Sequence, residues 1–308
     1  MSLETDLLLD RRRLKRRLVF WRSFAVLAVL AAILVALRGE KLGFGGGSHL
    51  ERLTVSGVIS DDRKLNEAIA KLADDNSVKA LIVFIDSPGG SVAGGEGLHD
   101  SIARVAAKKP VVAVMGGTAA SAGYMIAAPA TRIFAREATL TGSIGVLLET
   151  GEVSGLLDKI GIKADTLVSG PLKGQPSFTK PLSPEGRQAL QDLVMDMYEQ
   201  FVAMVANGRH MDVAKVKELA DGRAYTGRQA LQLGLVDQIG GEHDAREWLA
   251  KEKKISADLP VEDLSTSSLA RRALSLSLGW MVETIWKNVL SQGVMLDAPQ
   301  AVWQRSAG

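Results

Sequence analysis

The sequence predicts an α/β domain whose core is a parallel sheet with flanking helices. Two continuous apolar runs, 80–85 and 110–115, are typical of strands that are buried on both faces. The β-branched segment 53–59 predicts a first strand, and the segments 61–73 and 98–107 have helical spacing. Strands that alternate with helices in this way favour βα units wound into one sheet.

The rest of the chain continues this pattern with shorter elements. Further strands are predicted at 132–135, 144–148 and 234–237, and helices at 183–208, 212–220 and 227–233. The stretch 269–290 has amphipathic spacing. This spacing fits packing on the core or on a neighbouring subunit, and it also fits contact with a membrane surface.

Composition excludes several classes of function. The 308 residues carry a net charge of +2, but residues 1–22 alone carry +4, so the remainder sums to −2. No broad basic face is left for nucleic acid, which we therefore exclude as a partner. The absence of Cys excludes disulfides, Cys-ligated zinc, iron–sulfur clusters and thiol catalysis. The four His residues form no HxxxH pair, so we expect neither a metal site nor a cofactor.

The N-terminal segments predict a membrane anchor. Residues 1–17 form a basic arm, and residues 18–37 form an apolar stretch of 20 residues. At ~1.5 Å per residue this stretch matches a ~30 Å hydrocarbon core. The positive-inside rule places residues 1–17 in the cytoplasm and the rest of the chain outside, with 38–50 as a flexible linker. The alternative is a cleaved signal peptide.

Three turns carry residues that could do chemistry. The first, Asp86–Val92, follows a buried strand, and its glycines would let a substrate carbonyl approach the main chain, although an ordinary tight turn fits equally. The second contains Ser121, which opens a helix where the N–H of Ala122 could stabilise an oxyanion. A plain N-cap serine is the alternative. The third, 139–146, contains Ser143, whose hydroxyl could orient a base or lie in a plain strand turn.

A serine nucleophile needs a base, and no His lies near Ser121 in the sequence. A lysine can serve when burial keeps its amine neutral. Lys173 is the best candidate because it lies in a loop of small residues with no acid close in sequence, and Lys180 is the second.

These segments together resemble the signal peptide peptidase A family of serine peptidases. The resemblance rests on DSPGGSV, AASAGYMIA, TLTGSIGV, SGPLK and DGRAYTGRQALQLGLVDQIG in this order, between about residues 51 and 245. It implies a fold similar to the Clp and crotonase superfamily, and the short bacterial form with a single anchor. It implies Ser121 as nucleophile, Lys173 as general base, Ser143 as the base-orienting hydroxyl, and Gly90 and Ala122 as the oxyanion hole.

The resemblance also implies where the protein acts and on what. We expect a peptidase domain at 51–255 and a C-terminal amphipathic region at 256–308, on the periplasmic side of a bacterial inner membrane. The expected substrates are signal-peptide remnants and other extended peptides, and the expected assembly is a homo-oligomeric ring whose subunits share active sites. The alternatives are a crotonase-like acyl-thioester enzyme and a non-catalytic membrane scaffold.

Overall fold

The computed structural model describes residue 17 and residues 20–26 and 47–264. The chain divides into two units, 1–263 and 264–308, and the description below concerns the first. The predicted amphipathic segment 269–290 and most of the predicted anchor lie outside the described residues, although residues 20–26 are helical. Within the described ranges, no helix combines the length and the apolar character needed to cross a membrane.

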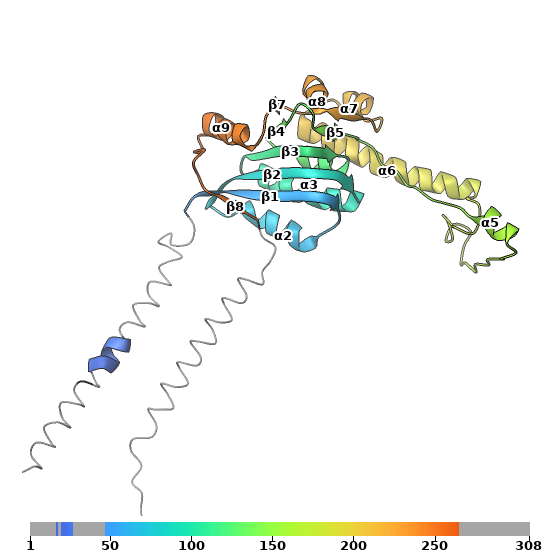
Figure 1. The fold of residues 1–308 in the computed structure, drawn as a ribbon, viewed down its shortest axis with the longest axis horizontal. Coiled ribbons are helices and arrows are strands. Elements are labelled where there is room, and N and C mark those ends of the chain that lie inside the picture. Colours follow the sequence, from blue (N-terminus) through green and yellow to red (C-terminus); the bar gives the residue numbers. More distant parts are fainter. Residues whose placement is uncertain (1–16, 18–19, 27–46, 265–308) are drawn as a thin grey trace, which may run out of the picture. The chain divides into compact units, whose positions relative to one another are not determined.

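The described elements alternate between strands and helices through most of the chain (Figure 1). In chain order they are β1 (His49–Ile59), α2 (Arg63–Leu72), β2 (Val78–Gly90), α3 (Val92–Ala106), β3 (Val111–Ala120), α4 (Ala122–Ala127), β4 (Arg132–Ala135), β5 (Leu140–Gly142), α5 (Ser154–Lys159), α6 (Pro184–Arg209), α7 (Val213–Leu219), β6 (Ala224–Thr226), α8 (Gly227–Gln232), β7 (Gln238–Ile239), α9 (Glu242–Lys253) and β8 (Val261–Asp263).

The strands form one mixed sheet with the order β6-β5-β3-β2-β1-β8, and β4 and β7 extend it beside β3. Every strand pair is parallel except β5–β6 at one edge, which is antiparallel. The predicted parallel core with flanking helices is therefore confirmed, with an antiparallel edge that the sequence analysis did not predict.

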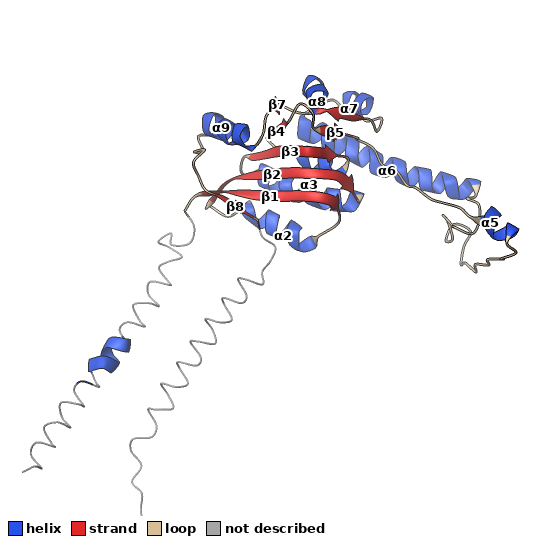
Figure 2. Ribbon diagram, viewed as in Figure 1, coloured by secondary structure: helices blue, strands red, loops and turns tan. Residues whose placement is uncertain are grey.

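Helices cover both faces of the sheet (Figure 2). On one face, Leu249 of α9 packs with Leu50 and Ile82 in the buried core. On the other face α4 lies over β2, where a Cβ built on Gly123 would lie 3.7 Å from the side chain of Ile85. The two faces are apolar because β2 has a continuous hydrophobic run, as a strand between two helix layers requires.

Side-chain caps fix where the helices begin. Asp62 accepts hydrogen bonds from the first turn of α2, Ser91 accepts one from the N–H of Gly94 in α3, and Ser183 accepts one from the N–H of Gly186 in α6. Each cap satisfies an amide that the helix itself leaves unbonded. The caps therefore explain why α3 starts directly after β2, earlier than the predicted residue 98.

Three local predictions are wrong. β2 continues through Gly90, because β1 pairs with it to that point, so the predicted turn at 86–92 is largely strand. The strand predicted at 144–148 is instead β5 at 140–142, because Gly142 and Ser143 both have positive φ and end the extended backbone. The strand predicted at 234–237 is a turn closing α8, and β7 follows it at 238–239.

A long segment of the chain contributes almost nothing to the core. Between residues 147 and 200 only Gly186 is buried. This segment, which we call the arm, comprises α5, its loops and the first half of α6 (Figure 1). The buried residues of α6 other than Gly186 lie in its second half, from Phe201 to Ala206. The arm is therefore held to the domain through one end of α6.

Candidate active site

The strand ends that carry the predicted site residues meet at one edge of the sheet. Ser87 of β2 pairs in register with Ala119 of β3, and Ala120 pairs with Gly142 of β5. Because β2, β3 and β5 run in the same direction, the residues that follow them lie together at their carboxyl ends. Ser121 directly follows β3, so it lies at this edge.

Ser121 has an unusual backbone conformation, with φ 54° and ψ −123°. Its amide donates to the carbonyl of Gly142 at 2.9 Å, and its own carbonyl accepts from Tyr124 and Met125. Ser121 occupies the N-cap position of α4, but its side chain makes no capping hydrogen bond. The N-cap interpretation of this hydroxyl is therefore wrong. A serine held on a strained turn between strand and helix presents its hydroxyl as a nucleophile elbow does.

The amide groups beside Ser121 are suited to hold an oxyanion. Ala122 is buried in the first turn of α4, and its N–H has no acceptor among the described residues. Gly89 lies against the serine: a Cβ built on it would be 3.2 Å from Ser121 Oγ and 2.8 Å from Ser121 Cβ. Gly90 lies against β1, where a Cβ would be 1.9 Å from the carbonyl oxygen of Ile59. Gly89 therefore leaves the main chain next to the hydroxyl accessible, whereas Gly90 packs against β1.

Ser87 holds this glycine turn in place. Its fully buried hydroxyl donates to the carbonyl of Gly57 at 2.6 Å and accepts from the N–H of Gly89 at 3.1 Å. The helix also approaches closely, because a Cβ on Gly123 would be 2.9 Å from the carbonyl oxygen of Ser87. Strand β2, strand β1 and helix α4 are thus joined around one buried serine.

Ser143 begins the next segment along the edge. It has φ 50°, and its amide donates to the carbonyl of Arg223 at 2.9 Å. Gly142 precedes it with φ 75°, and a Cβ there would overlap the Tyr225 ring at 2.6 Å. Ala120 at the end of β3 pairs with Gly142 at the end of β5, and the Ser121 amide donates to the Gly142 carbonyl. Ser121 and Ser143 therefore follow the ends of two paired strands.

The tyrosines near this edge are donors rather than bases. The Tyr124 hydroxyl donates to the carbonyl of Leu235 at 2.9 Å, and burial raises the pKa of Tyr124 far above its usual value. Burial likewise raises the pKa of Tyr225, whose hydroxyl donates to Leu219. None of the four His residues hydrogen-bonds to Ser121.

Lys173, the predicted base, is exposed and lies in the arm between α5 and α6. Its ammonium group makes no ion pair with a described residue, whereas Lys180 Nζ lies 3.8 Å from the Asp165 carboxylate. The structure of one chain thus brings Ala122 and the Ser143 segment to Ser121, with Gly90 one residue from the Gly89 that contacts the serine, and it leaves Lys173 in the exposed arm.

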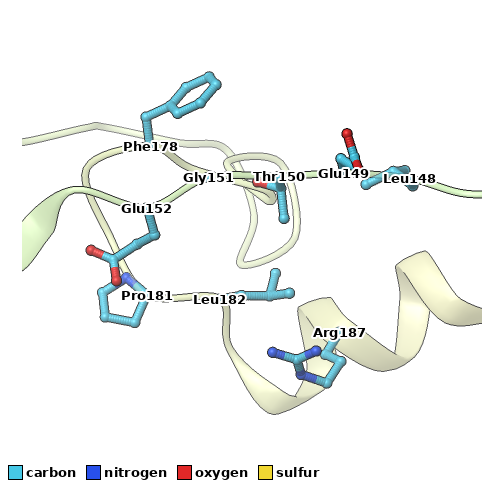
Figure 3. Close-up of a pocket in the computed structure, with 9 residues that line it drawn as sticks. All are labelled: Leu148, Glu149, Thr150, Gly151, Glu152, Phe178, Pro181, Leu182 and Arg187. Atoms are coloured by element: carbon cyan, nitrogen blue, oxygen red, sulfur yellow. The ribbon is translucent and has the colours of Figure 1, made fainter.

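The arm also contains an open hollow of about 930 Å³, lined by residues of its outgoing and returning segments (Figure 3). The two segments are joined where the amide of Val153 donates to the carbonyl of Phe178 at 2.8 Å. In Figure 3, Arg187 approaches the hollow from the first turns of α6. None of the predicted site residues lines it, so it is a feature of the arm and not part of the strand-edge site.

Ser87 is a residue of the edge to which the sequence analysis assigned no role, and it ties the turn together. Of the two glycines predicted to admit a substrate carbonyl, Gly89 is the one in contact with Ser121. The φ of 117° at Gly89 is a conformation that glycine adopts easily, which explains the glycine at this position of the motif. An α/β domain that holds a serine at the end of a buried strand, beside an amide without an acceptor in the described part of the chain, has the features of a serine hydrolase.

Comparison with known proteins identifies the family. Residues 103–256 match peptidase family S49. A Synechocystis protein named as a putative protease is 44% identical over 202 residues, which cover 65% of this chain and 73% of that protein. An Enterococcus faecium protein named as a putative signal peptide peptidase SppA is 40% identical over 227 residues, which cover 68% and 65% of the two chains. The structure of a ClpP1 mutant from Listeria monocytogenes aligns with a TM-score of 0.41 and 20% identity, covering 63% of this chain and 92% of that one.

The chain belongs to peptidase family S49 and is a serine peptidase. The family resemblance that the motifs indicate is thereby confirmed.

Proposed function

We propose that the protein is a membrane-anchored serine endopeptidase that uses a Ser121–Lys173 dyad on extended peptides. The observation that supports it most is the state of Ser121. Its hydroxyl is not used as a helix cap, its backbone is strained, and the adjacent Ala122 amide has no acceptor within the described ranges. A residue kept in a costly conformation without a structural hydrogen bond is typical of a functional site.

In the proposed mechanism, the neutral amine of Lys173 takes the proton of the Ser121 hydroxyl. The serine oxygen attacks the peptide carbonyl, and the amides of Gly90 and Ala122 hold the oxyanion. The amine then gives its proton to the leaving nitrogen, which releases the first product and leaves an acyl-enzyme. A water molecule, deprotonated by the same amine, hydrolyses the ester and restores the serine. Ser143 would orient Lys173 by a hydrogen bond.

We propose that Lys173 reaches the serine of a neighbouring subunit. Lys173 is exposed in an arm that has almost no contact with its own core. The arm also presents large apolar side chains to solvent, with Leu167 at 95% and Leu147 at 78% exposure. Such a surface is typical of an interface between copies. Closure of these contacts around an axis would give a ring.

Signal-peptide remnants are the proposed substrates. The Enterococcus relative carries the name of a signal peptide peptidase, and the predicted anchor at 18–37 would hold the site near the membrane, on its periplasmic side. Extended peptides fit because a strand edge can pair with their backbone.

Extraction of bacterial membranes with alkaline carbonate tests the anchor: the full chain should stay in the pellet, and a chain beginning after residue 38 should be released.

The nucleophile is tested with a fluorophosphonate probe and a peptide substrate. We expect labelling at Ser121, lost in Ser121→Ala, and a loss of kcat of at least about 1,000-fold in both Ser121→Ala and Lys173→Ala. Lys180→Ala is the matched control and should retain activity. Labelling or cleavage that survives in Ser121→Ala would refute the assignment.

Sharing of the site is tested by mixing two inactive variants. If Ser121 and Lys173 come from different subunits, Ser121→Ala and Lys173→Ala chains that refold or exchange together form some intact sites. Random mixing in equal amounts should restore about one quarter of the wild-type activity, because a site needs one chain of each kind in the correct order. Mixed assemblies without any activity would place both groups in one chain.

A further inference from the structure

The far end of the sheet from Ser121 carries a second group of chemically active side chains. His49 and Glu51 lie at the start of β1, and Glu262 lies in β8. We call these three residues the His49 cluster. One ligand atom from each lies within 4.8 Å of the other two. Neither the predicted mechanism nor the family assignment uses them.

The strand register explains why the three side chains share one face. His49 and Glu51 are two residues apart on β1, so both point to the same side of the sheet. Glu51 is the direct cross-strand partner of Glu262. Two carboxylates directly opposite each other repel, and this arrangement lowers stability unless a positive charge lies between them.

In the next residue pair along β1 and β8, a positive side chain faces the carboxylate. Arg52 is the partner of Asp263, and its guanidinium Nε lies 2.7 Å from the carboxylate. Within the described chain, Glu51 and Glu262 have no Lys or Arg partner within 4.0 Å, and the basic group that they share is His49. Lys109, a nearby cation, donates instead to the carbonyls of Leu72 and Asp75.

The contacts of His49 are compatible with a metal ligand. Its Nδ1 lies 3.1 Å from the carbonyl oxygen of Gly47 and 4.0 Å from Glu262 Oε1, and its Nε2 lies 3.2 Å from Glu51 Oε2. With Nδ1–H donating to Gly47, a metal ion that replaces the proton on Nε2 would be shared with Glu51. A histidine that binds a metal usually donates its other ring nitrogen to a carbonyl in this way. Ligand atoms around a tetrahedral zinc ion, each at ~2.05 Å, are about 3.3 Å apart, which matches the separation of Nε2 and Oε2.

Burial supports the same conclusion. His49 is 6% exposed and Glu51 8%, while the Glu262 side chain remains 55% exposed. Two ligands are therefore held in a fixed position, and the third can close on an ion that enters from solvent. One nitrogen and two carboxylate oxygens suit a borderline divalent ion such as Zn²⁺, and they suit Mg²⁺ less, because Mg²⁺ prefers oxygen ligands alone.

We propose that the His49 cluster binds one divalent transition-metal ion of the Zn²⁺ class. The ion would join the first strand of the domain to its last described strand. It lies at the start of β1, whereas the candidate active site lies beyond the end of that strand, where Ile59 pairs with Gly90. The site is therefore structural, and the proposal does not rest on the proposed peptidase mechanism.

The test is titration of the EDTA-treated full chain with Zn²⁺, followed by calorimetry and thermal unfolding. We expect one ion per chain, and a rise in Tm of about 5–10 °C at a hundredfold excess over Kd. Mg²⁺ at the same concentration should have no such effect. His49→Gln and Glu262→Gln should each weaken Zn²⁺ binding by at least about 10-fold. Glu262→Gln without metal should melt close to the wild-type chain, because the Glu262 side chain is 55% exposed.

A matched control uses another histidine–glutamate pair on the surface. His243 Nε2 lies 3.3 Å from Glu247 Oε1 on α9, and both side chains are exposed. His243→Gln should bind Zn²⁺ as the wild-type chain does. The proposal would be overturned by the absence of saturable binding to the wild-type chain, by unchanged binding in both His49→Gln and Glu262→Gln, or by loss of binding in His243→Gln.

Discussion

The backbone of Ser121 carries a free-energy cost that its neighbours must offset. A non-glycine residue with positive φ costs about 1–3 kcal/mol. Here the Ser121 amide is bonded to Gly142, and its carbonyl accepts two amides of α4. These bonds fix the residue between a buried strand and a buried helix, so the hydroxyl is oriented before any substrate arrives. Such preorganisation is what a nucleophile requires.

Gly89→Ala should inactivate the enzyme. The new Cβ would meet Ser121 Cβ at 2.8 Å, and the residue has φ 117°, so either the serine or the turn must move. We expect the free energy of unfolding to fall by about 1–3 kcal/mol and kcat/KM to fall by about 100-fold or more. Gly155→Ala is the control, because a Cβ there has no neighbour within 4 Å. Peptide cleavage and thermal unfolding of both variants check this, and an active Gly89→Ala enzyme would contradict the assigned geometry.

Ser87→Ala should loosen the same turn without touching Ser121, the proposed nucleophile. It leaves the Gly57 carbonyl and the Gly89 amide without their partner in a buried site. The expected loss of stability is about 1–3 kcal/mol. Ser101→Ala offers a comparison, because the Ser101 hydroxyl only donates to Gly97 in its own helix. Chemical denaturation should rank Ser87→Ala well below Ser101→Ala in stability, and equal stability would argue against this role.

At the scale of elements, the sequence predicted what depends on local patterns. Buried strands such as β2 follow from continuous apolar runs, and the start of α4 follows from a strand that ends in small residues. The wrong strand at 144–148 shows the limit, because apolar residues such as Leu147 suggest burial that the chain does not provide. Their burial would depend on contacts outside this chain, which a local pattern does not encode.

The sites show the same division. Ser121, Ala122 and Gly90 come to one edge because each follows or ends a parallel strand, and this could be predicted from the order of the elements. Glu262 could not be connected with Glu51, because only the pairing of β8 with β1 brings them opposite each other. The position of Lys173 relative to a serine depends on the arm, which has few contacts to specify it.

Replacement of 154–177 by a short Asn-Gly turn should leave the domain folded and remove activity. Val153 and Phe178 are hydrogen-bonded, so a tight turn can join the two segments. The removed residues include no buried one, and a shorter loop costs less entropy, so we expect Tm to change by less than about 3 °C. Activity should fall to the level of Lys173→Ala. Retained cleavage by this variant would exclude Lys173 as the base.

At the scale of the whole molecule, the exposed apolar residues of the arm would contact a neighbouring subunit in the proposed assembly. Leu167 and Phe178 are 95% and 70% exposed in the single chain. In a monomer, a charge at such positions changes stability by less than about 0.5 kcal/mol. At an interface between copies, the same charge would be buried without a partner, which is costly. The two situations therefore predict different results for one substitution.

Leu167→Glu and Phe178→Glu should each dissociate the assembly and abolish cleavage, while the melting of the separate domain stays close to that of the wild type. Light scattering coupled to gel filtration measures the mass, and the peptide assay measures activity. Val213→Glu is the control, because Val213 is 48% exposed on α7, outside the arm. If the two arm variants keep the mass and activity of the control, the arm does not mediate assembly. Loss of activity without a change of mass would mean that the arm positions Lys173 without holding the subunits together.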